Sequence, residues 1–206
     1  MTVTAGYKSD VYITSTPSVS MTNEATTADA TRELYTITDS LKRYWDDSAA
    51  FVIETSPDGT TWSAATGYTL QYVGGVVVFG SAQSVGTQIR VTSGKYFPFS
   101  KLANGTEWDI SVDMNLVDVT KFGDVWKLQL PLQKSGSAKV NSYFVDGTFL
   151  SYLGSKMILI LYVDATSTTR YETFAYLTNE SIKTVATGVI EDDLSFEISG
   201  PVYFVP

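Results

Sequence analysis

The chain has 206 residues, of which 44% are hydrophobic and 17% are charged, and its net charge is −8. This length can bury a core without disulfides, and the apolar content predicts a folded chain. The absence of Cys and His excludes a thiol nucleophile, a thiolate or imidazole metal site and a Ser-His-Asp triad, and the acidic balance disfavours binding to nucleic acid phosphates.

The first segment, residues 1–33, is rich in Ser, Thr and Ala, with one strand-like cluster around residues 7–13. Two interpretations stay open: a frayed terminus, or an arm that becomes ordered against a neighbouring subunit. The first residues lack the basic and apolar regions of a signal peptide, and no apolar run approaches the roughly 20 residues of a membrane span. We therefore expect synthesis in the cytoplasm and no membrane insertion.

Residues 34–94 predict a small β module. A turn signal at 56–59 and a glycine pair at 74–75 separate runs of strand-like residues. Residues 68–73 alternate large and polar side chains, and the glycine pair predicts a hairpin into residues 76–79. Short strands at such close and even spacing are typical of a β module.

Residues 95–206 carry longer predicted strands. Between residues 107 and 114, apolar side chains alternate with the acidic residues Glu107, Asp109 and Asp113. Since successive side chains of a strand point to opposite faces, one face of this strand is expected to be apolar and the other acidic. The simplest interpretation of the acidic face is the solvent side of an antiparallel sheet.

One helix is expected at residues 146–153, where Asp146 can cap the first turn and Gly154 can end the helix. The continuous apolar run at 157–163 predicts a strand that is buried on both faces. The predicted fold class is mainly β: a β-sandwich or partial barrel with one short flanking α-helix. Three parts are expected: an arm with a possible first strand (1–33), an inserted β module (34–94) and the sandwich core (95–206).

Two other functions stay open on the residues alone. The pairs Asp46-Asp47 and Asp192-Asp193 can be read as half of a two-carboxylate glycosidase or as Ca²⁺ ligands, although adjacent carboxylates beside strands are usually solvated turn residues. Trp62 follows a turn and can be read as the sugar-stacking platform of a carbohydrate- or receptor-binding module. The binding module is the second interpretation, and the glycosidase ranks last.

The segment 108–127 resembles the major tail (tail tube) proteins of bacteriophages with long, non-contractile tails. The resemblance rests on a strand, a Thr-x-Phe-Gly-Asp-x-Trp loop at 120–126, and a following strand. It extends over roughly residues 95–206, through a strand at 139–144, the short helix and the strand at 157–163. Residues 34–94 would be an insertion in that fold, placed either on the outer wall of the tube or between rings.

The resemblance implies a structural protein with no catalysis and no cofactor. Its subunits would form six-membered rings that stack around a tape measure protein and meet tail tip and terminator proteins. The tube would conduct viral DNA in transit at infection, and it would belong to the virion tail after assembly in the host cytoplasm.

Within this interpretation, the acidic face of Glu107, Asp109 and Asp113 is expected to line the channel, because carboxylates repel DNA phosphates. The low charge content fits large interfaces between subunits, where charged residues are depleted. Candidate residues of an inter-subunit loop are Asp118, Lys121, Phe122 and Asp124.

Overall fold

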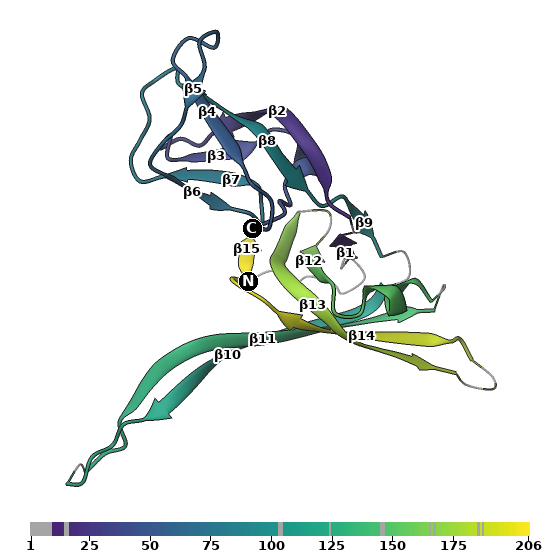
Figure 1. Cartoon of the computed structure of the whole chain (residues 1–206). Coiled ribbons are helices and arrows are strands. Elements are labelled where there is room, and N and C mark those ends of the chain that lie inside the picture. The colour runs from purple at the N-terminus through teal and green to yellow at the C-terminus, as the bar shows by residue number, and fades with distance from the viewer. Residues whose placement is uncertain are drawn as a thin grey trace.

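The computed structural model describes residues 10–14, 17–102, 105–123, 125–144, 147–164, 166, 168–184, 186 and 188–206. Most of these residues lie in the strands of two antiparallel sheets, so the prediction of a mainly β fold is confirmed. The two sheets occupy different ends of the molecule (Figure 1). Within the described part of the chain, no helix has both the length and the apolar character needed to cross a membrane.

The first sheet has eight strands. Seven of them follow the order β10-β11-β14-β13-β12-β1-β9, and β15 pairs with β13. The strand bounds are β1 Asp10–Thr14, β9 Phe99–Lys101, β10 Gly105–Asp118, β11 Gln129–Tyr143, β12 Lys156–Asp164, β13 Thr169–Lys183, β14 Glu191–Ile198 and β15 Tyr203–Val205.

The second sheet has seven strands in the order β5-β4-β8-β2-β3-β7-β6. Their bounds are β2 Val19–Ala28, β3 Leu34–Ile37, β4 Val52–Ser56, β5 Ser63–Ala64, β6 Tyr68–Gln71, β7 Val76–Phe79 and β8 Gln88–Tyr96. The sheet is inserted between β1 and β9 of the first sheet. Residues 19–28, which the sequence groups with the N-terminal arm, form β2 and pair with β3 and β8. The three-part division of the chain stays a prediction.

The first sheet curls around one hydrophobic core. Side chains from β1, β11, β12, β13 and β14 meet in a single buried cluster, which places β1 and β12 across from β11 and β14. Strand β12 contributes Met157, Leu159 and Leu161 to this cluster and turns Ile158 and Ile160 to the opposite side, where they are also buried. The prediction that this apolar run is buried on both faces is therefore confirmed.

A second cluster joins the two sheets. Ile158, Ile160 and Phe174 of the first sheet pack against Tyr44, Val73 and Phe97, which flank the strands of the second. A polar contact lies beside this cluster, where the Tyr44 hydroxyl donates a hydrogen bond to Glu172 (2.8 Å). The second sheet therefore packs on the outer side of β12 and β13.

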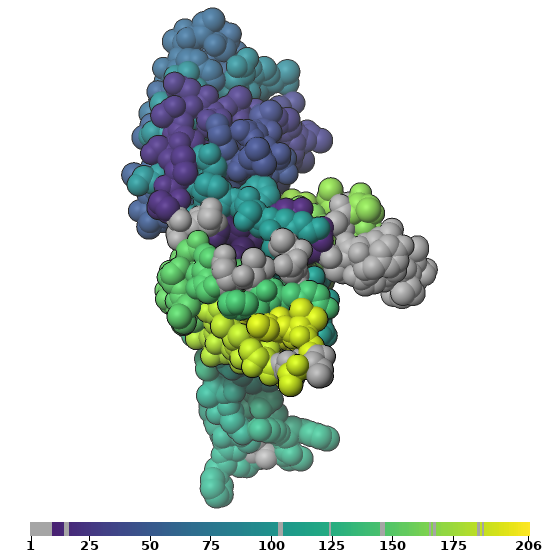
Figure 2. Space-filling view, turned by 90° about the vertical axis from the view of Figure 1, so that its right-hand side faces the viewer, coloured from purple at the N-terminus to yellow at the C-terminus, as the bar shows by residue number. Residues whose placement is uncertain are grey.

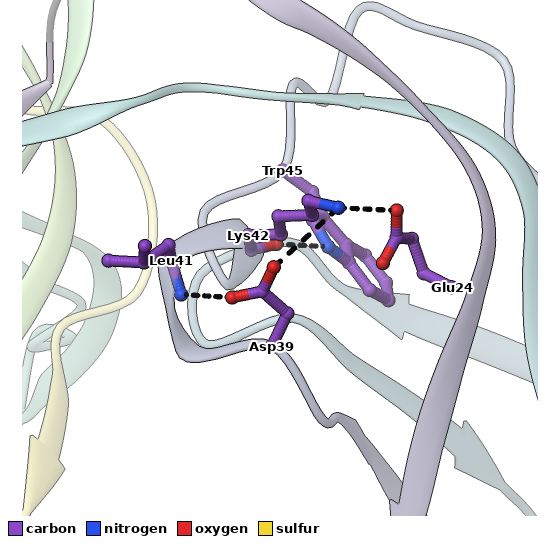
Figure 3. Close-up of polar contacts among 5 residues, drawn as sticks. All are labelled: Glu24, Asp39, Leu41, Lys42 and Trp45. Carbon is purple, nitrogen blue, oxygen red and sulfur yellow. Dashed lines mark hydrogen bonds and ion pairs between the residues drawn. The ribbon is translucent and has the colours of Figure 1, made fainter.

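Near this junction, the 3-10 helix η2 (Ser40–Lys42) is fixed to the second sheet by polar contacts (Figure 3). Asp39 accepts a hydrogen bond from the Leu41 backbone N–H (3.0 Å), and the Lys42 ammonium pairs with Glu24 of β2 at 2.6 Å. The indole N–H of the fully buried Trp45 donates to the Lys42 carbonyl (2.9 Å). These contacts place the Trp45 ring in the core of the second sheet.

The helix expected at residues 146–153 is a 3-10 helix, η3 (Thr148–Tyr152), and the prediction of an α-helix is wrong in this respect. Gly147 precedes its first turn without a side-chain cap, and five residues give little room for α-helical hydrogen bonds. Asp146, the expected cap, lies outside the described residues. Phe149 and Tyr152 pack against the core of the first sheet, so the segment still covers that core.

The hairpin predicted around the glycine pair is confirmed, since β6 and β7 pair with Gln71 opposite Val76.

Gly75 has a φ of +65°, and a Cβ there would lie 2.9 Å from the Arg43 backbone. We expect Gly75→Ala to lower the free energy of unfolding by about 3 kcal/mol, from left-handed strain of about 1–2 kcal/mol plus this steric clash. Gly67, with a φ of +71° and open space around it, is the matched control. Urea unfolding of both variants checks the difference; equal losses would contradict it.

Candidate assembly surface

The longest projection from the first sheet is the end of the β10–β11 hairpin. Strand β14 pairs with β11 only from Ser137 to Tyr143, so the earlier part of β11 has β10 as its one neighbouring strand among the described residues. From here on, the arm means residues 112–134 of this hairpin and not the N-terminal segment 1–33. The arm extends away from the body of the molecule (Figure 1), and Figure 2 shows its teal residues beyond the body, at the end opposite the second sheet.

Apolar side chains cover this arm without being buried. At its tip, Phe122 is fully exposed, and Val125 and Trp126 are 91% and 82% exposed. A two-stranded hairpin is marginally stable by itself in water, and contiguous exposed apolar surface marks an interaction site. The further exposed members are Val112, Met114, Leu116, Val117, Val119, Leu128, Leu130 and Leu132.

The tip is held by its own polar contacts, so it presents these side chains from a defined turn. Asp118 accepts hydrogen bonds from the side chain and backbone of Thr120, and these bonds lower the pKa of its carboxyl. The Leu128 backbone N–H in turn donates to the Thr120 hydroxyl (2.9 Å). Of the predicted inter-subunit residues, the structure brings Asp118, Lys121 and Phe122 together at this tip, and Asp124 lies outside the described residues.

The body of the same strands has two different faces. Trp108 and Ile110 of β10 pack against the core, so Glu107 and Asp109, which alternate with them, face outward. The register continues this outward row across the sheet, since Glu107 lies opposite Asn141, which lies opposite Asp193. The alternation predicted from the sequence over residues 107–111 is therefore present in the structure. From Val112 onward, both faces of β10 are exposed.

The outward face is more acidic than the sequence of β10 indicates. From β10 across β11 to Asp193 and Glu197 it holds five carboxylates and one lysine, for a net charge of −4 (five negative minus one positive), and the Lys183–Glu191 ion pair at the end of the same face adds no net charge. We call this set the acidic face; its members are Glu107, Asp109, Asp113, Lys139, Asp193 and Glu197. The sequence pattern predicts a solvated turn at Asp193 and no role for Glu197. Their alternation with the buried Leu194 and Phe196 is the signal that identifies both.

The acidic face and the second sheet lie on opposite sides of the curled first sheet. The second sheet packs against β12 and β13, whereas the acidic face lies on β10, β11 and β14, across the core (Figure 1). In any ring that turns the acidic face inward, the second sheet is therefore directed outward.

The residues singled out for a sugar-binding module and for a glycosidase or Ca²⁺ site make contacts within the fold. The Arg90 guanidinium lies 4.0 Å above the ring of Trp62 and pairs with Glu54, so one stacking face of this indole is occupied. Asp46 accepts hydrogen bonds from Ser18 and Ser48, and Asp47 pairs with Lys156. Among the described residues, no group of three or more acidic side chains is placed to hold a metal ion.

Comparisons with known proteins give matches to solved structures, two of which are described here. No protein-family model matches this chain, and no curated protein sequence does. A solved structure described as the tail of an empty GTA particle, computed with helical refinement in C6 symmetry, is 17% identical, with a TM-score of 0.44 over 53% of this chain and 87% of the other. A second, described as the virion of a native gene transfer agent (GTA) particle, is 17% identical, with a TM-score of 0.43 over 52% and 89%. Both TM-scores lie below 0.5, which is too low for either match to support a function.

Proposed function

We propose that this chain is the structural subunit of a phage-type tail tube, which polymerises with copies of itself as stacked six-membered rings. The observation that carries the proposal is the arm, whose apolar side chains stay exposed among the residues that the structure describes. Burying such surface against a second copy is the main favourable contribution to association. The sequence resemblance to tail tube proteins supports the same role.

In this assembly the acidic face lines the channel. Its net charge of −4 repels phosphates, so viral DNA in transit passes without being retained. The second sheet then lies on the outer wall of the tube. The further partners of the chain are tape measure, tail tip and terminator proteins. The chain assembles in the host cytoplasm and then belongs to the virion tail.

Reversing charge on the acidic face tests the channel assignment. Glu107 and Asp109 are exposed and lie outside the arm, so the Glu107→Lys/Asp109→Lys variant is expected to fold and assemble normally. Its tubes are expected to retain duplex DNA at low salt at least about 10-fold more strongly than unmodified tubes, and to lose that difference as salt rises. Co-sedimentation of DNA with the tubes measures the effect.

Glu33→Lys, an exposed reversal on the second sheet, is the matched control and is expected to retain less DNA than the double variant. Particles that carry the double variant and still eject their DNA at the normal rate would contradict the assignment of the acidic face to the channel.

A further inference from the structure

A β-bulge near the end of β13 changes which side chains face the core. Leu177 lies opposite Phe196 and Asn179 lies opposite Ser195, so Thr178 is an extra residue on β13. After this extra residue, Glu180 lies opposite Leu194, whose side chain is buried. The bulge therefore directs a carboxylate onto the core side of the sheet.

Asp192 lies on the same side of the sheet. It precedes Leu194 by two residues on β14, it lies opposite Ile182, and it is 1% exposed. Glu180 and Asp192 are thus diagonal neighbours on one face of the β13–β14 pair. They lie beyond the apolar core, toward the end of the hairpin.

Three of the four oxygens of these two carboxylates are buried without a hydrogen-bond partner among the described residues. Both carboxylate oxygens of Glu180 and the Oδ1 atom of Asp192 are buried without one. The Ser142 hydroxyl donates its hydrogen bond to the backbone carbonyl of Asp192 and not to the Asp192 carboxylate. A buried carboxylate that is charged and unpaired is strongly unfavourable, so this arrangement favours the neutral form.

The surrounding elements supply no compensating cation among the described residues. On the strands themselves, Lys183 pairs with Glu191 at 3.7 Å, and Asp193 and Lys139 belong to the outward acidic face. Lys156 of β12 lies over the Phe174 ring on the opposite side of the sheet and pairs with Asp47, and η3 contributes Tyr152, which is not a cation, to the core side. Burial raises the pKa of Glu180, and the Asp192 charge raises it further; burial and the Asp193 charge raise the pKa of Asp192.

We propose that Glu180 and Asp192 form a proton-dependent latch on the β13–β14 hairpin. While at least one of the two carboxyls holds a proton, it can donate to its neighbour and the strands stay closed over the core. When both lose their protons, mutual repulsion and the need for water loosen this end of the hairpin. The inference is independent of the proposed assembly.

The direction of the pH effect follows from the raised pKa values. In the folded chain the pair holds protons at pH values where the unfolded chain has released them. The contribution of the pair to stability is therefore complete below the ordinary carboxyl pKa values and is lost as pH rises through the raised ones. Removing the ionisable groups is expected to abolish this loss.

Thermal unfolding of the full chain at pH 4.5 and pH 7.5 tests the latch. Glu180→Gln and Asp192→Asn keep the shape of each side chain. At pH 7.5, each is expected to raise the melting temperature above that of the unmodified chain, and this gain is expected to be about 2–5 °C larger than the gain at pH 4.5. The double variant is expected to gain less than the sum of the two single gains, because either substitution already relieves the repulsion. Glu197→Gln, on the outward face of β14, is the control and is expected to show no such pH-dependent gain.

Side-chain carboxyl ¹³C shifts measured by NMR give a second readout that does not depend on the stability of the variants. Protonation of one of the two carboxyls that persists to higher pH than that of the exposed carboxyls in the same spectrum would support the latch. Ordinary titration of both, or variants that lose stability equally at both pH values, would overturn it. A rise in melting temperature of the unmodified chain on adding Ca²⁺ at pH 7.5, absent from the double variant, would also overturn it, since the pair would then be a cation site.

Discussion

Replacing Phe122 and Trp126 together by Asp is expected to prevent assembly while leaving the subunit folded. Both rings are exposed at the tip of the arm and contact little of their own subunit, so their loss costs it little stability. In an interface, loss of a buried aromatic anchor costs about 2 kcal/mol or more. The two substitutions are therefore expected to raise the concentration needed for assembly at least about 100-fold.

Sedimentation and electron microscopy over a range of concentrations measure this change, with circular dichroism to confirm that the subunit is folded. Val85→Asp is the matched control, because Val85 is 83% exposed but lies on the second sheet's side of the molecule. Normal tubes from the Phe122→Asp/Trp126→Asp variant would show that the arm tip is not an assembly contact.

Glu172→Ala is expected to cause one of the largest losses of stability that a single substitution can produce in this chain. Glu172 is 1% exposed, pairs with the buried Arg170 and accepts the hydrogen bond from Tyr44. Without it, the Arg170 guanidinium is left buried and uncompensated, which costs about 3–5 kcal/mol. For a chain of this size the melting temperature is expected to fall by about 6–20 °C.

Removing an exposed ion pair from the same sheet is the control for this loss. Glu191 pairs with Lys183 at 3.7 Å with both side chains more than half exposed, and Glu191→Ala is expected to change the free energy of unfolding by less than about 1 kcal/mol. Differential scanning calorimetry compares the two variants. Similar small effects at both positions would contradict the assigned importance of the Arg170–Glu172 pair at the junction of the sheets.

Alternation along single strands was predictable because the parity of side chains in a strand determines the face that they occupy. For this reason the sequence places Glu107 and Asp109 on one face of β10, and the apolar run at 157–163 indicates a strand buried on both sides. The full acidic face was not predictable from β10 alone. It requires the register that places β14 beside β11, and with it Asp193 and Glu197.

Other features depend on lengths and irregularities that a single strand does not encode. The arm leaves the core because β11 has 15 residues while its neighbour β14 has 8, so its apolar side chains resemble core residues in the sequence. Strand β2 was not predicted, because Met21 is its one buried residue and the strand therefore shows no hydrophobic alternation. Glu180 reaches the core side through the bulge at Thr178, which becomes visible only when β13 is paired with β14.

We propose that copies of this chain build a tube with the acidic face inward and the second sheet outward. Electron cryomicroscopy of the concentrated, purified protein tests it most directly. We expect hollow tubes of six-fold rings, with Glu107, Asp109 and Glu197 at the channel wall and the arm in contact with a neighbouring copy. A uniform population of monomers at every concentration, or assemblies that place the acidic face on the outer wall, would contradict the account.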